Sequence, residues 1–241
     1  MNVKALLGRI RKKIYRRVYL GGVDTIDHIR ARNQDFDRVR ELIRQSGTDD
    51  LSYFGSSYTH QGGLSLQQNP DEFAALICFL KEYRDQRGQF VNYMEIGSAS
   101  GGACLLLNRE LNIGNTFSLD DATHPRALEQ KANFQQIANL RQFIGDSHSP
   151  EAREFLVNNL EGKLDLAFID GDHSYDGVRK DFYLTLQFCR PGTLIIFHDT
   201  VACEGVRKMW WESIISRRVA AFAEYVGSER AMGIGIASVR R

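Results

Sequence analysis

The stretch "AFIDGDHSYDGVRKDF", residues 167–182, sets acidic and histidine side chains directly after an apolar run. Asp170 and Asp172 are two positions apart, and His173 follows them. Carboxylate oxygens are ligands for divalent cations such as magnesium, and an imidazole can accept a proton near neutral pH. A hydroxyl group held beside these residues could be both positioned and deprotonated. Asp172 and His173 are therefore our candidate catalytic residues.

A second apolar run, "GTLIIFHD", ends in the same kinds of side chain, His198 and Asp199. If the two runs are neighbouring parallel strands, their carboxyl ends meet at one edge of a sheet. Asp170, Asp199 and His198 then become candidate ligands of a metal ion. A lone histidine is more often a hydrogen-bonded structural residue than a ligand or a base, and this interpretation stays open for His173 and His198.

The charged residues further along this stretch are interpreted differently. Asp176, Arg179, Lys180 and Asp181 fall within a helical pattern. Charged residues at such spacing usually cover a solvated helix face. We therefore assign these four side chains no chemical role.

The segment "YMEIGSASGGACLLL" combines a strand containing Glu95 with three glycines, Gly97, Gly101 and Gly102, before a helix. Glycine lets the backbone approach a ligand closely, and a helix N-terminus offers unpaired N–H groups. The spacing differs from the G-x-G-x-x-G of dinucleotide-binding enzymes, which argues against a nicotinamide-dependent oxidoreductase. A tight turn needed only for packing is the competing explanation.

Acidic residues also end the next two apolar runs. "NTFSLD" ends in Asp120, about 25 residues after Glu95, where a carboxylate can receive a ribose diol. "LRQFIG" is followed by Asp146, which can accept a hydrogen bond from an adenine amino group. Each aspartate could instead cap a following helix. Acids at three consecutive strand ends favour a ligand site.

These residues need a parallel sheet to bring them together. Short apolar runs, separated by roughly 20 to 30 residues, alternate with helical patterns, which is typical of βα units. The runs are "FVNYMEIG", "NTFSLD", "LRQFIG", "LDLAFID" and "GTLIIFHD". "AAFAEYVG" and "GIGIASV" would add an antiparallel edge. We expect an α/β fold with a Rossmann-like, seven-stranded, mostly parallel sheet and helices on both faces.

The chain before this sheet has helical patterns. Residues 1–20 contain seven basic and no acidic residues, with apolar residues at three- and four-residue steps. Residues 24–46 predict one further amphipathic helix, and Pro70 begins another. We divide the chain into a helical N-terminal extension, 1–60, and a main domain, 61–241. The basic helix either lies on an anionic membrane or an acidic partner, or docks on its own domain or on the second copy of a homodimer.

Composition and charge exclude several classes of protein. The net charge is +1, so the residues after 20 together carry about −6. A chain that binds nucleic acid would usually be basic over its body, and we expect no nucleic-acid partner. The four cysteines form no C-x-x-C pair, which is typical of reduced thiols in the cytosol. We expect a cytoplasmic protein, peripheral at the inner membrane surface if the basic helix binds lipid.

Four motifs make the chain resemble the class I S-adenosylmethionine-dependent methyltransferases from about Gly62 to the C-terminus. They are "GGLSLQQNPDEFAAL", "EIGSASGG", "IDGDHSYDGVRKDF" and "FCRPGTLIIFHD". Within that superfamily the chain looks most similar to the cephalosporin hydroxylase-type and macrocin or rhamnosyl O-methyltransferase group. The last two motifs are the most specific.

The resemblance implies a role for each residue of the strand-end rim. The implied cofactor-binding residues are Gln67, Glu95, Gly97, Ser98, Gly101, Gly102, Asp120, Asp146, Ser147 and Asp170. Metal-dependent relatives hold magnesium with an aspartate at the position of Asp170 and with acids after the following strand, and Asp172 would then be the base. His198 stands where some of these relatives carry an acid. This difference matters because magnesium prefers oxygen ligands.

The implied activity is O-methylation of a small-molecule or sugar hydroxyl with S-adenosylmethionine as cofactor, with or without magnesium. A sulfonium methyl is already electrophilic, so the enzyme must align acceptor oxygen, methyl and sulfur and remove the hydroxyl proton. We expect acceptor-binding residues near Tyr58, His60, His148 and Trp210. The alternative is a non-catalytic cofactor-binding protein that residues 1–20 recruit to a membrane or partner.

Overall fold

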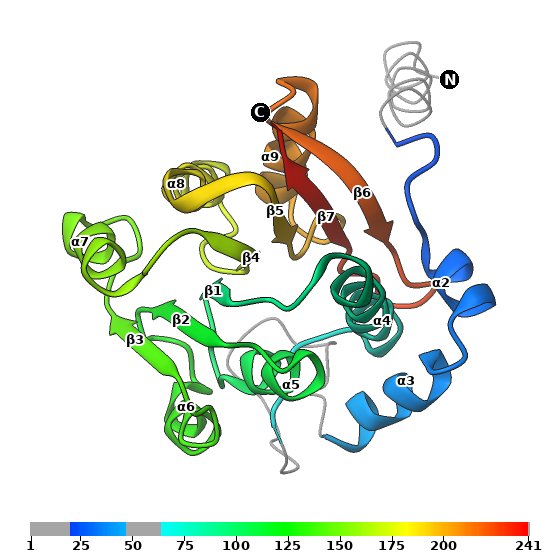
Figure 1. Cartoon of the computed structure of the whole chain (residues 1–241), viewed down its shortest axis with the longest axis horizontal. Helices are drawn as coiled ribbons and strands as arrows, with labels where there is room; N and C mark the ends of the chain where they lie inside the picture. The colour runs from blue at the N-terminus through cyan, green and yellow to red at the C-terminus, as the bar shows by residue number, and fades with distance from the viewer. Residues whose placement is uncertain (1–19, 47–63, 241) are drawn as a thin grey trace, which may run out of the picture.

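The computed structural model describes residues 20–46 and 64–240, which contain a seven-stranded sheet in the order β3-β2-β1-β4-β5-β7-β6 (Figure 1). The strands are β1 (Asn92–Ile96), β2 (Asn115–Asp120), β3 (Leu140–Ile144), β4 (Leu164–Ile169), β5 (Cys189–Phe197), β6 (Val219–Tyr225) and β7 (Ile234–Val239). β1 to β5 are parallel, and β7 runs antiparallel between β5 and β6. The predicted α/β fold is confirmed, including the antiparallel pair at its end.

The central strands are apolar on both faces, which explains their continuous apolar runs in the sequence. In β4, Leu166 and Phe168 belong to the core on one face of the sheet, and Ala167 and Ile169 belong to the cores on the other. Successive side chains of a strand point to opposite faces. A parallel sheet covered by helices on both sides therefore favours apolar residues at most positions of its central strands.

Three helices cover each face of the sheet (Figure 1). One layer consists of α4 (Pro70–Arg87), α5 (Gly102–Leu111) and α6 (Ala127–Phe134), and the other of α7 (Pro150–Asn159), α8 (Tyr175–Phe188) and α9 (Glu204–Ile215). α4 begins as predicted. Pro70 is its first residue, and the Asn69 side chain accepts the backbone N–H groups of Asp71 and Glu72 at 3.0 and 3.2 Å.

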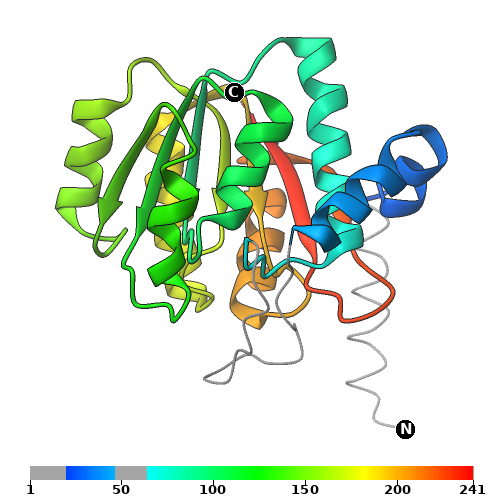
Figure 2. The same cartoon turned by 90° about the horizontal axis from the view of Figure 1, so that it is seen from below.

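The single helix predicted over residues 24–46 is wrong, because two helices occupy this range. They are α2 (Ile26–Arg32) and α3 (Phe36–Gln45). The helix is interrupted at Asn33. The side-chain oxygen of Asn33 accepts the backbone N–H of Asp35 at 3.0 Å, which forms a turn. Figure 2 shows both helices beside α4. Ile29 and Val39 lie in the same core as the apolar side chains of α4.

The expected basic helix of residues 1–20 lies, apart from Leu20, outside the residues that the structure describes. Its contact with a membrane, a partner or a second copy therefore stays a prediction. Among the described residues, no helix has the length and apolar character that crossing a bilayer requires.

The backbone at Asp24 closes one edge of the sheet. Its N–H donates to the carbonyl of Phe222 at 2.9 Å, and its carbonyl accepts the N–H of Glu224 at 3.1 Å. The Asp24 carboxylate pairs with Arg32, which also donates to Glu82 of α4 at 2.9 Å. The outer side of β6 is therefore occupied along this stretch, and the covering segment is fixed to α4.

Glu72 ties the start of α4 to the loop between β6 and β7. This side chain is fully buried, and its two carboxylate oxygens accept the backbone N–H groups of Gly227 and Gly233 at 2.7 and 2.9 Å. Burial raises the pKa of the carboxyl group, although both hydrogen bonds favour its charged form. One buried side chain thus fixes a long surface loop next to the carboxyl edge of the sheet.

Candidate functional site

A pocket of about 770 Å³ lies at the carboxyl ends of β1 to β4, and we call it the carboxyl-edge pocket. Open α/β sheets place their ligands at this edge, and the volume is in the range of small-molecule sites. Nine of the residues expected from the sequence line the pocket: Gln67, Gly97, Asp120, Asp146, Ser147, His148, Asp170, Asp172 and His173. The strand ends therefore converge as predicted.

The turn after β1 forms one wall of the pocket. Gly97 has φ +83°, and a Cβ added there would overlap the carbonyl oxygen of Asp170. Only glycine fits this close contact between the ends of β1 and β4. Gly101 and Gly102 begin α5 but do not line the pocket. A Cβ on Gly102 would overlap the carbonyl oxygen of Leu64, so this glycine is explained by packing.

Asp120, the last residue of β2, is held in one orientation by the backbone. Its Oδ2 accepts the N–H of Ala99 at 2.9 Å, and its Oδ1 accepts the N–H of Ala122 at 2.7 Å. Each carboxylate oxygen keeps a free lone pair, so the group could also receive a diol from the pocket. Asp120 is not the cap of the next helix, because α6 begins at Ala127 after Arg126.

Asp146 and Ser147 lie in the loop between β3 and α7. Asp146 accepts the backbone N–H of His148 at 2.8 Å, while Ser149 caps α7. The side chain of Asp146 is 69% exposed, which leaves its second oxygen available to a ligand. The competing explanation of Asp146 as a direct helix cap therefore does not hold.

The prediction that Asp181 belongs to a solvated helix face is wrong. Asp181 is fully buried and lies behind the loop that lines the pocket. Its Oδ1 accepts the Ser147 hydroxyl at 2.7 Å and lies 3.1 Å from His148 Nε2. Burial raises the pKa of Asp181 to about 6, although Ser147 and His148 favour its charged form. Through these contacts α8 fixes the position of Ser147 and His148.

Four side chains after β4 and β5 are linked by short contacts between carboxylates and imidazoles, and we call them the His–Asp cluster: Asp170, His173, His198 and Asp199. Asp170 Oδ1 lies 3.0 Å from His198 Nδ1 and 3.3 Å from His173 Nε2. Asp199 Oδ2 lies 3.3 Å from His173 Nε2 and 3.6 Å from His198 Nδ1. β4 and β5 are adjacent and parallel, so the residues that follow them meet. The three predicted metal ligands are thus brought together, and His173 joins them.

The cluster is buried and strongly coupled. His198 is 2% exposed and Asp199 is 1% exposed. Burial opposes the charge of Asp170, but His198 and His173 outweigh it and hold the pKa of this carboxyl at about 2. Burial also opposes the charge of His198, but Asp170 and Asp199 raise the pKa of this imidazole well above its usual value. The charges of Asp170 and His198 therefore depend on each other in the buried part of the cluster.

The donor atoms of the cluster do not suit magnesium. Two of the four converging atoms are imidazole nitrogens, of His173 and His198. Magnesium requires near-octahedral oxygen coordination and keeps several water ligands. The carboxylates of Asp170 and Asp199 alone would supply only part of such a shell.

The two candidate catalytic residues differ in their surroundings. Asp172 is exposed and accepts the backbone N–H of Ser174 at 2.8 Å and the Ser174 hydroxyl at 3.0 Å. These bonds lower the pKa of Asp172, so its carboxylate is a weak base. His173 is part of the His–Asp cluster, and its side chain is 35% exposed where it lines the pocket.

Several expected residues lie outside the pocket lining. Glu95 is 1% exposed, accepts a hydrogen bond from the Tyr93 hydroxyl, and has a pKa that burial raises to about 8. The Ser98 hydroxyl lies 2.9 Å from that of Ser118 behind the turn. Trp210 was expected near the acceptor, and this is wrong because the indole is fully buried in the core. Tyr58 and His60 fall outside the described residues.

Sequence reasoning did not find the loop between β2 and α6. Thr123, His124 and Pro125 line the pocket. His124 Nε2 lies 3.4 Å from the side-chain nitrogen of Gln67, which fixes the two residues in one wall. The sequence of this loop has neither apolar periodicity nor a strand end, so only its position after Asp120 could have indicated a role.

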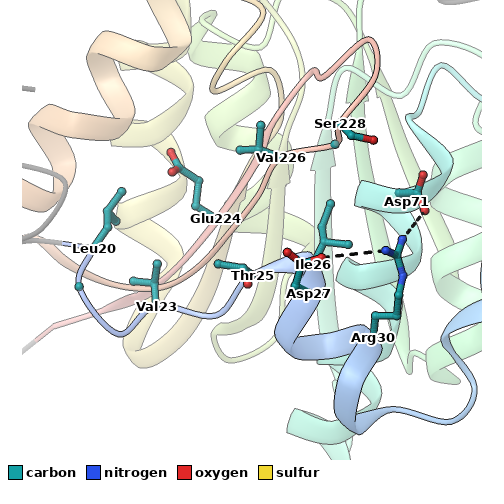
Figure 3. Close-up of a pocket in the computed structure, with 12 residues that line it drawn as sticks. Leu20, Val23, Thr25, Ile26, Asp27, Arg30, Asp71, Glu224, Val226 and Ser228 are labelled. Atoms are coloured by element: carbon teal, nitrogen blue, oxygen red, sulfur yellow. Dashed lines mark hydrogen bonds and ion pairs between the residues drawn. The ribbon is translucent and has the colours of Figure 1, made fainter. Parts of the chain in front are cut away.

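A second cavity, of about 520 Å³, lies beside the edge strand β6 (Figure 3). Leu20 and Val23 supply part of its apolar lining. Arg30 lies 3.0 Å from Asp71 and 4.0 Å from Asp27, so its charge is balanced within the cavity wall. None of its lining residues comes from the ends of β1 to β4, and we assign this cavity no role in the chemistry.

Residues 94–200 match a family model described as a methyltransferase domain. An uncharacterised protein of Acanthamoeba polyphaga mimivirus is 28% identical over 113 residues, which cover 45% of this chain and 51% of that protein. The chain therefore spans about half the length of this relative. The residues that match the family model begin in β1 and end just after β5. They contain every lining residue of the pocket except Gln67.

Solved structures of methyltransferases share the fold. An O-methyltransferase from Bacillus cereus, in complex with S-adenosylhomocysteine, has a TM-score of 0.57 at 20% identity and covers 87% of this chain and 92% of its own. The O-methyltransferase TomG from Streptomyces achromogenes, involved in tomaymycin synthesis and bound to S-adenosylmethionine, has a TM-score of 0.57 at 16% identity, covering 87% and 91%. The N-methyltransferase NodS from Bradyrhizobium japonicum has a TM-score of 0.51 at 14% identity, covering 73% and 100%.

These likenesses show the fold, and the cephalosporin hydroxylase-type or macrocin-like subgroup stays a prediction. The family model adds the kind of domain, because it covers the strands whose ends form the carboxyl-edge pocket. The ends of these strands carry Gly97, Asp120 and Asp170. Residues 94–200 of the chain are similar to the methyltransferase domain that this family model describes.

Proposed function

We propose that the protein transfers the methyl group of S-adenosylmethionine to a hydroxyl group of a small molecule or sugar. The observation that carries the proposal is Asp120, whose carboxylate is oriented by two backbone N–H groups and faces the pocket of a methyltransferase domain. A fixed carboxylate with free lone pairs can accept both hydroxyl groups of a ribose. The solved O-methyltransferases with the same fold support this assignment.

The cofactor would extend along the ends of β1 to β3. Gly97 and Ala99 line the pocket where the backbone of the first turn can approach the methionine part. Asp146 presents an exposed carboxylate for the adenine amino group, and Ser147 lies beside it. Gln67 lines the pocket beside His124, where it would cover the bound cofactor.

The acceptor would enter at the His–Asp cluster, at the other end of the pocket. The acceptor oxygen forms the new bond to the methyl carbon while the bond from that carbon to sulfur breaks, which leaves S-adenosylhomocysteine and one proton from the hydroxyl. Asp172 is poorly suited to take this proton, because its lowered pKa makes it a weak base. We place the proton acceptor in the cluster, which reaches the pocket through Asp170 and His173.

Calorimetric titration with S-adenosylhomocysteine tests the cofactor site. We expect micromolar binding by the native chain and at least about tenfold weaker binding by Asp120→Asn, because the amide NH2 group cannot accept a hydrogen bond from a ribose hydroxyl. Asp176→Asn, which changes an exposed carboxylate on α8, is the matched control and keeps the native affinity. If the native chain binds no S-adenosylhomocysteine, or if Asp120→Asn binds it equally well, the proposed function is wrong.

The choice of acceptor atom needs a separate assay, since the same fold serves the N-methyltransferase NodS. We expect transfer from S-adenosylmethionine to alcohols and sugar hydroxyls in a panel of acceptors that also contains amines. Methylation of the amines alone would leave the cofactor assignment in place and contradict O-methylation.

A further inference from the structure

We propose that the outer face of α8 and α9 binds the surface of an anionic lipid bilayer. Both helices belong to the same layer of the fold, on one side of the sheet (Figure 1). We call this surface the basic face, and its residues come from the two helices and from the positions next to the ends of β6 and β7: Tyr175, Arg179, Tyr183, Lys208, Arg218 and Arg240. None of them lines the carboxyl-edge pocket, so the inference goes beyond the proposed function and does not rest on it.

Aromatic rings hold the cations of the basic face next to one another. Tyr175, Arg179 and Tyr183 follow at four-residue steps and therefore share one side of α8. The Nζ atom of Lys208, on α9, lies 3.6 Å from the centre of the Tyr175 ring. The guanidinium carbons of Arg179 and Arg218 lie 5.5 and 5.0 Å from the centre of the Tyr183 ring. These cation–π contacts keep three positive charges along one continuous surface.

The positive charges of the basic face are not neutralised within the described part of the chain. No carboxylate of residues 20–46 and 64–240 lies within ion-pair distance of any of its four cations. The surface helices α2 and α3 differ, because most of their arginines lie beside a carboxylate: Arg30, Arg32, Arg38 and Arg40. The residues after 20 together carry about −6, so a basic face is exceptional on this body. Its partner is therefore expected to be negatively charged.

Apolar side chains lie next to these cations on α9. Lys208, Trp211 and Ile215 follow at steps of three and four residues, so they share the outer side of the helix. Ile215 is 46% exposed, and Trp211 is only partly buried. A bilayer surface offers phosphate groups to cations and hydrocarbon to apolar side chains, and tryptophan is enriched at this interface. A nucleic acid would neutralise the charges but leave Ile215 in water, so the combination favours a lipid surface.

The position of Leu20 places a second basic region near the same face. Leu20 is 7% exposed and packs in the core cluster that contains Met209 and Trp210 of α9. The residues before it, 1–19, contain seven basic and no acidic residues and join the described chain at this point. Attraction to an anionic surface grows with each cation, and stable anchoring takes more than one signal. The basic face would supply a signal additional to the basic residues that the sequence indicated.

Co-sedimentation of the full chain with lipid vesicles tests the proposal. One kind of vesicle consists of phosphatidylcholine alone, and the other also contains about 30% phosphatidylglycerol, which is anionic. We expect binding to the anionic vesicles only, and weaker binding when the salt concentration rises from about 0.1 M to about 0.5 M, because salt screens the charges. Calorimetric titration with S-adenosylhomocysteine reports the carboxyl-edge pocket of the same preparations independently of lipid.

Two triple variants locate the binding surface. The first removes three cations of the basic face: Arg179→Gln, Lys208→Gln and Arg218→Gln. Each cation near an anionic surface contributes about fivefold to the partition coefficient, so this variant should bind anionic vesicles at least about tenfold more weakly. The control removes the same charge from exposed positions on α3, α4 and α6 and should keep the native partition coefficient: Arg44→Gln, Arg87→Gln and Lys131→Gln. All the replaced side chains are exposed, so both variants should fold.

A second pair of variants tests the apolar contact. Ile215→Ser should weaken binding to the anionic vesicles, because serine places no hydrocarbon in the bilayer. Leu128→Ser, on α6, is the matched control, since Leu128 is an apolar side chain that is 92% exposed outside the basic face. This control should bind the vesicles as the native chain does.

Three results would overturn the proposal: equal binding to both kinds of vesicle, native affinity in the triple variant of the basic face, or an equal loss of affinity in its control. Binding to neither kind of vesicle would overturn it as well, and retention of the chain on duplex DNA or on polyglutamate would then identify the polyanion that the face prefers. Each of these results leaves the proposed function intact. Lipid binding without S-adenosylhomocysteine binding would support the basic face and contradict the cofactor site instead.

Discussion

Replacing Asp181 by asparagine should flatten the pH dependence of stability. In the folded chain burial raises the pKa of Asp181 from the ordinary value of 3.8 to about 6, and contacts with Ser147 and His148 oppose the rise. A raised pKa means that folding favours the protonated carboxyl. Its stabilising contribution is therefore fully present below pH 3.8 and is lost as the pH rises through 6.

The size of the effect follows from these two pKa values. Between pH 5 and pH 8 the native chain should lose about 1.4 kcal/mol of unfolding free energy through this one carboxyl. Asparagine has nearly the same shape and can still accept the Ser147 hydroxyl, but it does not ionise. His148 and Asp172 also act on Asp181, and both remain in the variant.

The assay is urea unfolding followed by circular dichroism at pH 5, 6, 7 and 8 for the native chain and for Asp181→Asn. Asp176→Asn, an exposed carboxylate on the same helix, controls for the loss of a negative charge from α8. The reasoning is refuted if Asp181→Asn follows the native pH profile, or if Asp176→Asn flattens it equally.

Substitutions at three further positions, with Gly22→Ala as a control, test the packing around the site. Gly97→Ala should lower the unfolding free energy by about 2–5 kcal/mol, because the residue has a positive φ and the added Cβ would overlap Asp170. Gly22→Ala is the control: this residue also has a positive φ, +97°, but open space around it, so the loss should be only about 1–2 kcal/mol. Equal losses of unfolding free energy in urea would contradict this reasoning. Glu72→Gln should cost about 1–3 kcal/mol by the same measurement, because one backbone N–H of the β6–β7 loop loses its acceptor, and an unchanged midpoint would exclude this. Asn69→Ala should lower the unfolding free energy by about 1 kcal/mol, because the N-terminal cap of α4 is lost. Asn69→Ser should lower it much less, since a serine side chain can also cap a helix. Equal midpoints of thermal unfolding for the two variants would argue against the cap.

The ends of the strands could be predicted because an apolar run stops there and an acidic residue follows at once. The run in β4 is apolar from Leu166 to Ile169 and then meets Asp170, which is the pattern of a strand that is buried on both faces and ends at a polar rim. The parallel arrangement then determines that Asp120 and Asp170 share one edge. The start of α4 was predictable for a similarly local reason, the proline that follows the cap residue Asn69.

The position of Asp181 could not be read from its charge. It lies three residues after Val178 and four before Thr185, which are both buried, so the helical period places it on the inner face of α8. Its charge suggested the solvated face, and only its contact with Ser147 explains the burial. The break at Asn33 was missed because the apolar stripe continues in phase from α2 into α3.

The pairing of Asp24 with β6 has a consequence for how the chain can be shortened. An uncovered strand edge is a template for pairing with another molecule. Removing residues 1–60 to isolate the main domain would strip the backbone of Asp24 from Phe222 and Glu224 and would also uncover α4 where Ile29 and Val39 pack. Such a truncated protein should self-associate through the uncovered edge of β6. Its oligomeric state would then result from the removal of the covering segment, and it would not show how the whole chain assembles.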